Sequence, residues 1–107
     1  IAGYRAQLNH EKFGGGLIVF CAINLEKHIL EQIQTFENEA IALDGVEACY
    51  HMAGVYDYLL KIRVKGMEAY KTFLAHDLAK IKNISRVQSS FVMAEVQSPP
   101  EKQWPLV

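Results

Sequence analysis

The sequence predicts one α+β domain whose elements follow the order βαββαβ, with four strands in an antiparallel sheet and two helices on one of its faces. Three observations lead to this prediction. Segments rich in β-branched and aromatic residues alternate with segments whose apolar residues recur every three or four positions. The order strand, helix, strand occurs twice, and right-handed crossovers then place both helices on the same face. The chain has 107 residues, enough for one hydrophobic core and too few for a second independent domain.

The first half of the chain predicts a strand, a helix and a second strand. Residues 17–25 are apolar and rich in β-branched types, and the preceding Gly14-Gly15-Gly16 marks a loop that enters this strand. The helix that follows has its apolar residues at spacings of three and four: Ile29, Ile33, Phe36, Ala40 and Leu43. Asp44-Gly45 supplies the left-handed backbone that ends a helix, and Val46–Ala53 is the second predicted strand.

The second half repeats this order. In Tyr58–Val64 every second residue from the first is large and apolar, as in a strand with one buried face. A second helix begins near Gly66, and its apolar face comprises Met67, Tyr70, Leu74, Leu78 and Ile81. Asn83 occupies the place that Gly45 has after the first helix, since asparagine tolerates left-handed backbone. Val87–Val96 is the fourth predicted strand, which completes a ferredoxin-like arrangement.

The composition of two strands predicts a dimer. The first strand is apolar at consecutive positions over Leu17–Ile23, and the fourth is apolar over Phe91–Ala94. A strand of this composition is buried on both faces of its sheet. Two helices cover only one face, and the chain has no further element for the other. The sequence therefore predicts a homodimer in which two sheets face each other, an association of the dimeric α+β-barrel type.

Composition and charge exclude several classes of protein. The chain is 50% hydrophobic and 21% charged, and its formal net charge of -1 provides no positive field to attract nucleic acid. Its longest apolar run, Leu17–Ile23, is much shorter than the roughly 20 residues of a membrane-spanning helix. Cys21 and Cys49 lie in apolar surroundings without CxxC spacing, which indicates reduced core thiols. With no secretory signal at its start, the chain is predicted to be soluble and cytoplasmic, with no membrane partner.

The sequence shows none of the common catalytic or metal-binding motifs. No two of the four histidines, His10, His28, His51 and His76, have the i, i+4 spacing of paired metal ligands on a helix. Gly14-Gly15-Gly16 lacks the Lys and Ser/Thr of a phosphate-binding loop, and no nucleophile elbow or dinucleotide fingerprint occurs. We therefore predict no catalytic residue, no metal site and no cofactor, and expect the histidines to be solvated or capping residues.

The segment Gly54-Val55-Tyr56-Asp57-Tyr58 has two interpretations. It can be a hairpin connection, because glycine permits positive φ, aspartate bonds its own backbone and tyrosines pack on a sheet edge. It can also be a socket for an amino acid, in which a carboxylate between aromatic side chains holds an ammonium group and exposed N–H groups hold a carboxylate. Spacing alone leaves both interpretations open.

Several motifs in the same order give the chain a resemblance to a known family. They are Gly54-x-Tyr56-Asp57-Tyr58-Leu59-Leu60-Lys61-x-Arg63-Val64, then Met67-x-Ala69-Tyr70, and then Val92-Met93-x-Glu95-Val96. Over roughly residues 1–97 the chain resembles the C-terminal effector-binding (RAM) domain of the Lrp/AsnC family of feast/famine transcription regulators. A short extended segment predicted at Tyr4–Leu8 is similar to the hinge strand of that family.

The resemblance implies a division into three parts and a function. Residues 1–16 form a hinge strand and linker, 17–97 an effector-binding and oligomerisation domain, and 98–107 a C-terminal tail, where Trp104 is a candidate for docking against a neighbouring subunit. Dimers are expected to assemble into octamers. A small effector, an amino acid such as leucine or another apolar one, is expected to bind between dimers and to bias assembly and DNA binding.

The resemblance also implies which residues bind the effector. Carried over by position, they are Gly54, Val55, Tyr56, Asp57 and Tyr58 of the loop, together with Ser89 on the last strand. Asp57 is expected to recognise the ammonium group, and the Ser89 hydroxyl to donate or accept a hydrogen bond.

The DNA-binding helix-turn-helix of the family is absent from this chain, so DNA binding is expected only through that missing domain. The chain begins with Ile1 and not with Met, which favours a fragment of a full regulator over a stand-alone effector-domain protein. Two other classes remain as alternatives: a small dimeric α+β-barrel enzyme of the cofactor-free monooxygenase type, and an ACT-like regulatory module that binds amino acids.

Overall fold

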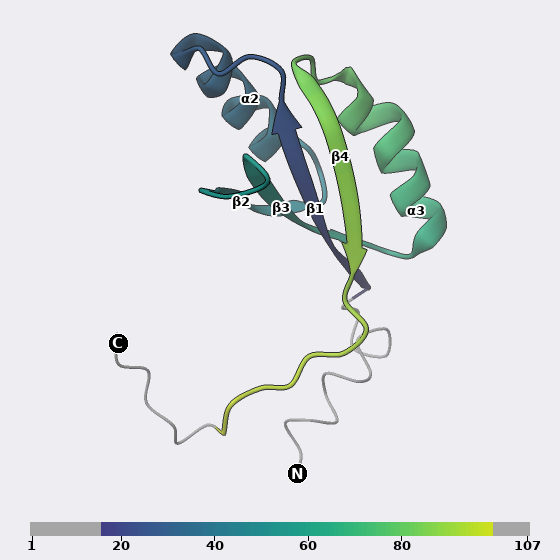
Figure 1. Cartoon of the computed structure of the whole chain (residues 1–107). Coiled ribbons are helices and arrows are strands. Elements are labelled where there is room, and N and C mark those ends of the chain that lie inside the picture. Colours follow the sequence, from purple (N-terminus) through teal and green to yellow (C-terminus); the bar gives the residue numbers. More distant parts are fainter. Residues whose placement is uncertain (1–15, 100–107) are drawn as a thin grey trace.

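A computed structural model of the chain describes residues 16–99 (Figure 1). Its elements are β1 (Leu17–Leu25), α2 (Leu30–Ala42), β2 (Val46–His51), β3 (Tyr58–Val64), α3 (Met67–Thr72), the π-helical turn η1 (Phe73–Asp77), the 3-10 turn η2 (Leu78–Lys80) and β4 (Ile84–Phe91). The predicted order βαββαβ is confirmed. The predicted segment Tyr4–Leu8 and the tail residue Trp104 lie outside the described residues.

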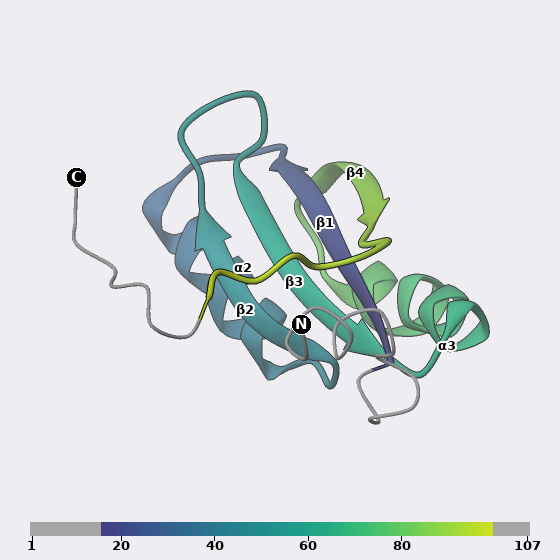
Figure 2. The same ribbon diagram turned by 90° about the horizontal axis from the view of Figure 1, so that it is seen from below.

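The four strands form one antiparallel sheet in the order β2-β3-β1-β4. β1 therefore lies inside the sheet, between β3 and β4, whereas β2 and β4 are its edges. In Figure 2 both α2 and the helical residues 67–80 lie behind the strands, so the two helices cover the same face of the sheet. This is the ferredoxin-like arrangement that the sequence predicts.

The hydrophobic core lies between the sheet and the helices. Val19, Cys21 and Ile23 of β1 face the helices, and the register places Cys21 opposite Leu60 and Val19 opposite Ile62 of β3. All five side chains are fully buried. The helical side of the core comprises Phe36, Ala40, Tyr70, Phe73, Leu78 and Ile81. The alternation that predicts β3 is thus an alternation between the core and the opposite face of the sheet.

The helices differ from the prediction in their continuity and in some of their buried residues. Ile29, expected on the apolar face of the first helix, is 61% exposed because it precedes α2 as an extended residue. The second helix is not continuous: α3 ends at Thr72, and in the π-helical turn that follows the N–H of Leu78 donates to the carbonyl of Phe73. Phe73 is buried although the predicted apolar face omits it, whereas Met67, which that face includes, is 49% exposed.

The second strand is shorter than predicted. The sequence predicts a strand over Val46–Ala53, whereas β2 ends at His51. The next N–H, that of Met52, donates to the carbonyl of Asp57 at 2.8 Å and so closes the loop to β3.

The fourth strand is also displaced from its predicted bounds. It spans Ile84–Phe91, earlier than the predicted Val87–Val96. Its partner β1 begins at Leu17, so the bond from the N–H of Val92 to the carbonyl of Ile18 is close to the last pairing that β1 can offer.

Burial on both faces is found for β1 but not for the end of β4. Of the β1 residues that point away from the helices, Ile18 and Ala22 are buried and Phe20 is half-buried. By contrast, Phe91 is 42% and Met93 94% exposed. The prediction that the fourth strand is buried on both faces is therefore wrong for a single chain, because the residues after β4 leave the body of the domain (Figure 1).

Candidate functional site

The loop that connects β2 to β3, residues 52–57, contains most of the predicted effector-binding residues. The N–H of Asp57 donates to the carbonyl of Ile23 at 3.0 Å, and the carbonyl of Asp57 accepts the N–H of Met52 at 2.8 Å. These bonds extend the backbone pairing of the sheet into the loop. The end of the loop is thereby fixed beside the end of β1, where the turn 26–29 leads to α2.

Asp57 is bound through both its side chain and its main chain. Its Oδ2 accepts a hydrogen bond from the N–H of Leu25 at 2.8 Å and lies 2.9 Å from Nε2 of His28. Its N–H also donates to Oδ1 of Asn24 at 3.0 Å. The N–H of Leu25, and after it His28, hold the pKa of the Asp57 carboxyl below its usual value. The loop therefore carries a fixed negative charge.

Tyr56 joins the same loop to β4. Its hydroxyl donates a hydrogen bond to Oε1 of Gln88, and the guanidinium carbon of Arg86 lies 5.8 Å from the centre of its ring. This distance is within the range of a cation–π interaction. Tyr56 and Asp57 thus attach one half of the loop to two different strands, β4 and β1.

The tip of the loop is exposed. Val55 is 79% and Met52 45% exposed, and a methyl group added at Gly54 would meet no atom within 4 Å. The structure thus combines a base held by hydrogen bonds with an open, partly apolar tip. Such loops on a rigid scaffold commonly carry binding functions.

Tyr58, the last predicted residue of the loop, belongs to the core. Its side chain is 1% exposed, its ring stacks on that of His51 at a centroid distance of 4.5 Å and contacts Phe36, and its hydroxyl donates to Glu37. Burial, and after it the Glu37 carboxylate, raise the pKa of Tyr58. Its side chain therefore holds β3 against α2 and does not line the surface of the loop.

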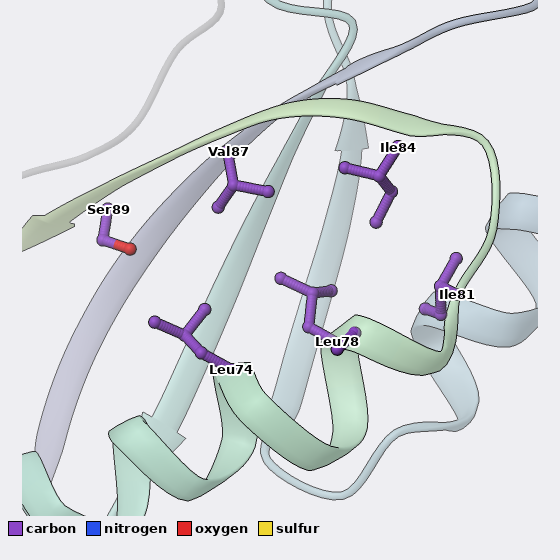
Figure 3. Close-up of a pocket in the computed structure, with 7 residues that line it drawn as sticks. Leu74, Leu78, Ile81, Ile84, Val87 and Ser89 are labelled. Atoms are coloured by element: carbon purple, nitrogen blue, oxygen red, sulfur yellow. The ribbon is translucent and has the colours of Figure 1, made fainter.

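Ser89 lies in a groove between the helical residues and β4 (Figure 3). Its Oγ lies 2.5 Å from the hydroxyl of Tyr70, and its partner on β1 is Cys21, on the helix-facing side of the sheet. The groove has a volume of about 450 Å³ and is lined by Leu74, Leu78, Ala79, Ile81, Ile84, Val87 and Ser89. Of the predicted effector-binding residues, the structure brings together those of the loop but does not bring Ser89 to them within one chain.

The side chains that hold the loop are not evident from the sequence. His28, expected to be solvated or capping, contacts Asp57 across 29 positions of sequence, and Asn24 does so across 33. Arg86 of β4 contacts the ring of Tyr56. These contacts depend on the pairing of β1 with β3 and β4, so no local pattern of residues predicts them.

Residues 16–99 contain no group of three His, Cys, Asp or Glu side chains that could hold a metal ion. Cys21 and Cys49 are free thiols, and burial raises the pKa of both. In the same part of the chain, no helix has the length and apolar character needed to cross a membrane.

Comparisons of the sequence with known proteins agree on one family. A model of the Lrp/AsnC ligand binding domain matches residues 18–101. The Bkd operon transcriptional regulator of Pseudomonas aeruginosa is 33% identical over 96 residues, which cover 90% of this chain and 63% of that protein. The leucine-responsive regulatory protein of Escherichia coli is 32% identical over 97 residues, covering 91% of this chain and 59% of that protein. The chain thus spans about three fifths of the length of these curated relatives.

Solved structures have the same fold. An AsnC family transcriptional regulator from Agrobacterium tumefaciens superimposes with a TM-score of 0.75 at 30% identity, covering 90% of this chain and 62% of that one. The transcriptional regulator NMB0573 of Neisseria meningitidis, in its complex with L-Met, also superimposes with a TM-score of 0.75, at 25% identity, covering 96% of this chain and 66% of that one.

Proposed function

The chain belongs to the Lrp/AsnC ligand-binding domain family, and we propose that it senses an amino-acid effector and thereby controls the assembly of a cytoplasmic transcription regulator. Its curated relatives are transcription regulators and not enzymes. In this proposal DNA is bound by a helix-turn-helix domain outside the chain, and the ligand-binding domain changes how those domains are presented.

The observation that carries the proposal is the fixed carboxylate of Asp57 beside an exposed loop tip. An amino acid presents an ammonium group, which a carboxylate binds through charge-assisted hydrogen bonds. Asp57 is ionised at neutral pH, and its lowered pKa reflects the donors that hold the carboxylate. Gly54 and Val55 are exposed, and in this proposal their N–H groups bind the effector carboxylate. The L-Met complex of the neisserial relative supports an amino acid as effector.

Assembly follows from where this loop lies. Because the loop tip is exposed at the surface of one subunit, an effector held there can also contact a second dimer. A ligand that contacts two dimers stabilises the arrangement in which they meet, and the affinity of the effector then depends on assembly to the same extent. We propose dimers that associate through the helix-free face of the sheet, and effector sites between such dimers in an octamer.

The test is titration calorimetry of the chain with each standard amino acid, starting with L-leucine and L-methionine, for the chain and for Asp57→Asn. Asparagine has the size of aspartate and still accepts the N–H of Leu25, but it has no charge. We expect binding to weaken by about tenfold or more, since hydrogen bonds to charged groups contribute about 1.5 to 3 kcal/mol. Asp44→Asn, an exposed carboxylate in the turn after α2, is the matched control and should bind as the unaltered chain does.

The outcomes separate the parts of this proposal. Equal affinity for Asp57→Asn and the unaltered chain removes Asp57 from the effector site. No binding of any standard amino acid contradicts amino-acid sensing as a whole.

A further inference from the structure

His28 occupies a defined position in the fold. It belongs to the turn 26–29, and Asn83 also holds this turn: Oδ1 of Asn83 accepts the N–H of Lys27 at 2.8 Å, and Nδ2 donates to the Lys27 carbonyl at 3.0 Å. The carbonyl of Asn83 also accepts the N–H of Glu26 at 2.9 Å. The imidazole of His28 is therefore held at the Asp57 carboxylate by its backbone as well as by the contact of 2.9 Å.

The chemistry of this contact determines the position of one hydrogen. An ionised carboxylate only accepts hydrogen bonds, so Nε2 of His28 must carry a hydrogen. The ring can satisfy this as the neutral Nε2–H tautomer or as the imidazolium cation. Histidine is the side chain that changes between these charges near neutral pH. The contact persists in both states, but the net charge of the pair is -1 in the first and zero in the second.

Other ionisable groups lie close to the pair. From the end of β2, His51 adds a weaker electrostatic effect on Asp57. The turn itself contains Glu26 and Lys27, and the first turn of α2 contains Glu31, all three exposed. His28 is in direct contact with Asp57, and its side chain is 57% exposed to solvent.

We propose that His28 is a positioning residue of the effector site, and that its added proton competes with the ammonium group of the amino acid for Asp57. This rests on the proposed function. Neutral His28 orients Oδ2 through its Nε2–H and leaves the negative charge of Asp57 available. Protonated His28 neutralises that charge. Because the competition is reciprocal, a bound amino acid also makes protonation of His28 less favourable.

The test is calorimetry with L-leucine and L-methionine at about pH 5.5 and about pH 7.5, on either side of the usual histidine titration. For the unaltered chain we expect roughly twofold to fivefold tighter binding at the higher pH, the size of effect that a partly exposed charge pair produces. His28→Gln retains an N–H donor but cannot gain a proton, so its affinity should be the same at both pH values. His76→Gln, an exposed histidine of η1, is the matched control and should retain the pH dependence.

A second measurement follows the proton directly. In NMR titrations of the histidine rings, the midpoint for His28 should move to lower pH when L-leucine or L-methionine is present, and the midpoint for His76 should not move. If the contact between His28 and Asp57 only stabilised the fold, the amino acid would not move the NMR midpoint of His28.

Each other outcome contradicts the inference. pH-independent binding by the unaltered chain overturns it while leaving the proposed function intact. Persistence of the pH dependence in His28→Gln, with loss in His51→Gln, assigns the effect to His51. Absence of binding by either amino acid at both pH values removes the premise, and the screen of the remaining amino acids then decides the proposed function separately.

Discussion

Asp57 has a structural role in addition to the proposed binding role. Its carboxylate joins the loop 52–57 to the end of β1 at Leu25 and to the turn before α2 at His28. We predict that Asp57→Ala lowers the free energy of unfolding at neutral pH by about 1 to 2 kcal/mol, since it leaves a backbone donor without its acceptor in a partly exposed site. Urea denaturation of the variant and the unaltered chain measures this difference.

The same prediction has a pH dependence whose sign follows from the lowered pKa of Asp57. A carboxyl whose pKa is lower in the folded than in the unfolded chain stabilises the fold fully above the unfolded value, about pH 4. This stabilisation is lost as the pH falls through the lower folded value. The difference between Asp57→Ala and the unaltered chain should therefore shrink below about pH 4. A difference that stays constant there would contradict a role for the ionised form.

Ser89 has a local partner that accounts for its hydroxyl. It is bonded to Tyr70, whose side chain is 1% exposed and whose pKa is raised by burial to about 12, so the phenol is neutral at physiological pH. We predict that Ser89→Ala lowers stability by about 1 kcal/mol and leaves amino-acid affinity unchanged. Thermal denaturation and calorimetry on the same samples measure the two effects. Weakened amino-acid binding with unchanged stability would show instead that Ser89 belongs to the effector site.

At the scale of elements, the sequence predicts those features that depend on neighbours along the chain. Alternation in Tyr58–Val64 predicts β3 with its observed bounds, because residues two positions apart share a face. Apolar residues at spacings of three and four predict α2, because such residues share one face of a helix. The end of β4 depends instead on where β1 begins, and the contact of His28 with Asp57 depends on strand pairing. Neither leaves a signal at its own position in the sequence.

The turn between η2 and β4 depends on one residue in left-handed backbone. Asn83 has a φ of 74°, as its place after the second helix predicts. We predict that Asn83→Ala lowers stability by about 2 kcal/mol, because alanine loses both the bonds to Lys27 and the tolerance for this backbone. Asn83→Gly loses only the bonds and should cost less. Equal losses, measured by thermal denaturation, would show that the bonds alone account for the effect.

At the scale of the whole molecule, the sheet has one face that the helices leave open. Tyr50, Leu59 and Ala22 form a row across β2, β3 and β1 on this face, and Phe20 lies in the next row, opposite Lys61. Towards β2 the face becomes charged, with Glu47 paired to Arg63 at 2.5 Å. An apolar centre with a charged margin is the usual composition of an interface between proteins. We therefore expect a second copy of the chain to cover this face.

This assignment makes the oligomeric state sensitive to Phe20. In a symmetric dimer one substitution changes both subunits. Phe20→Lys would therefore place two charges in the apolar centre of the interface, where lysine does not replace the packing of the phenylalanine ring. We predict that it weakens dimerisation by roughly a hundredfold or more and yields folded monomers, as measured by sedimentation velocity together with circular dichroism. Ile41→Lys introduces the same charge at a 52% exposed position of α2 and should leave the dimer intact. If instead Ile41→Lys dissociates the dimer and Phe20→Lys does not, the subunits associate through their helices and the open face serves another partner.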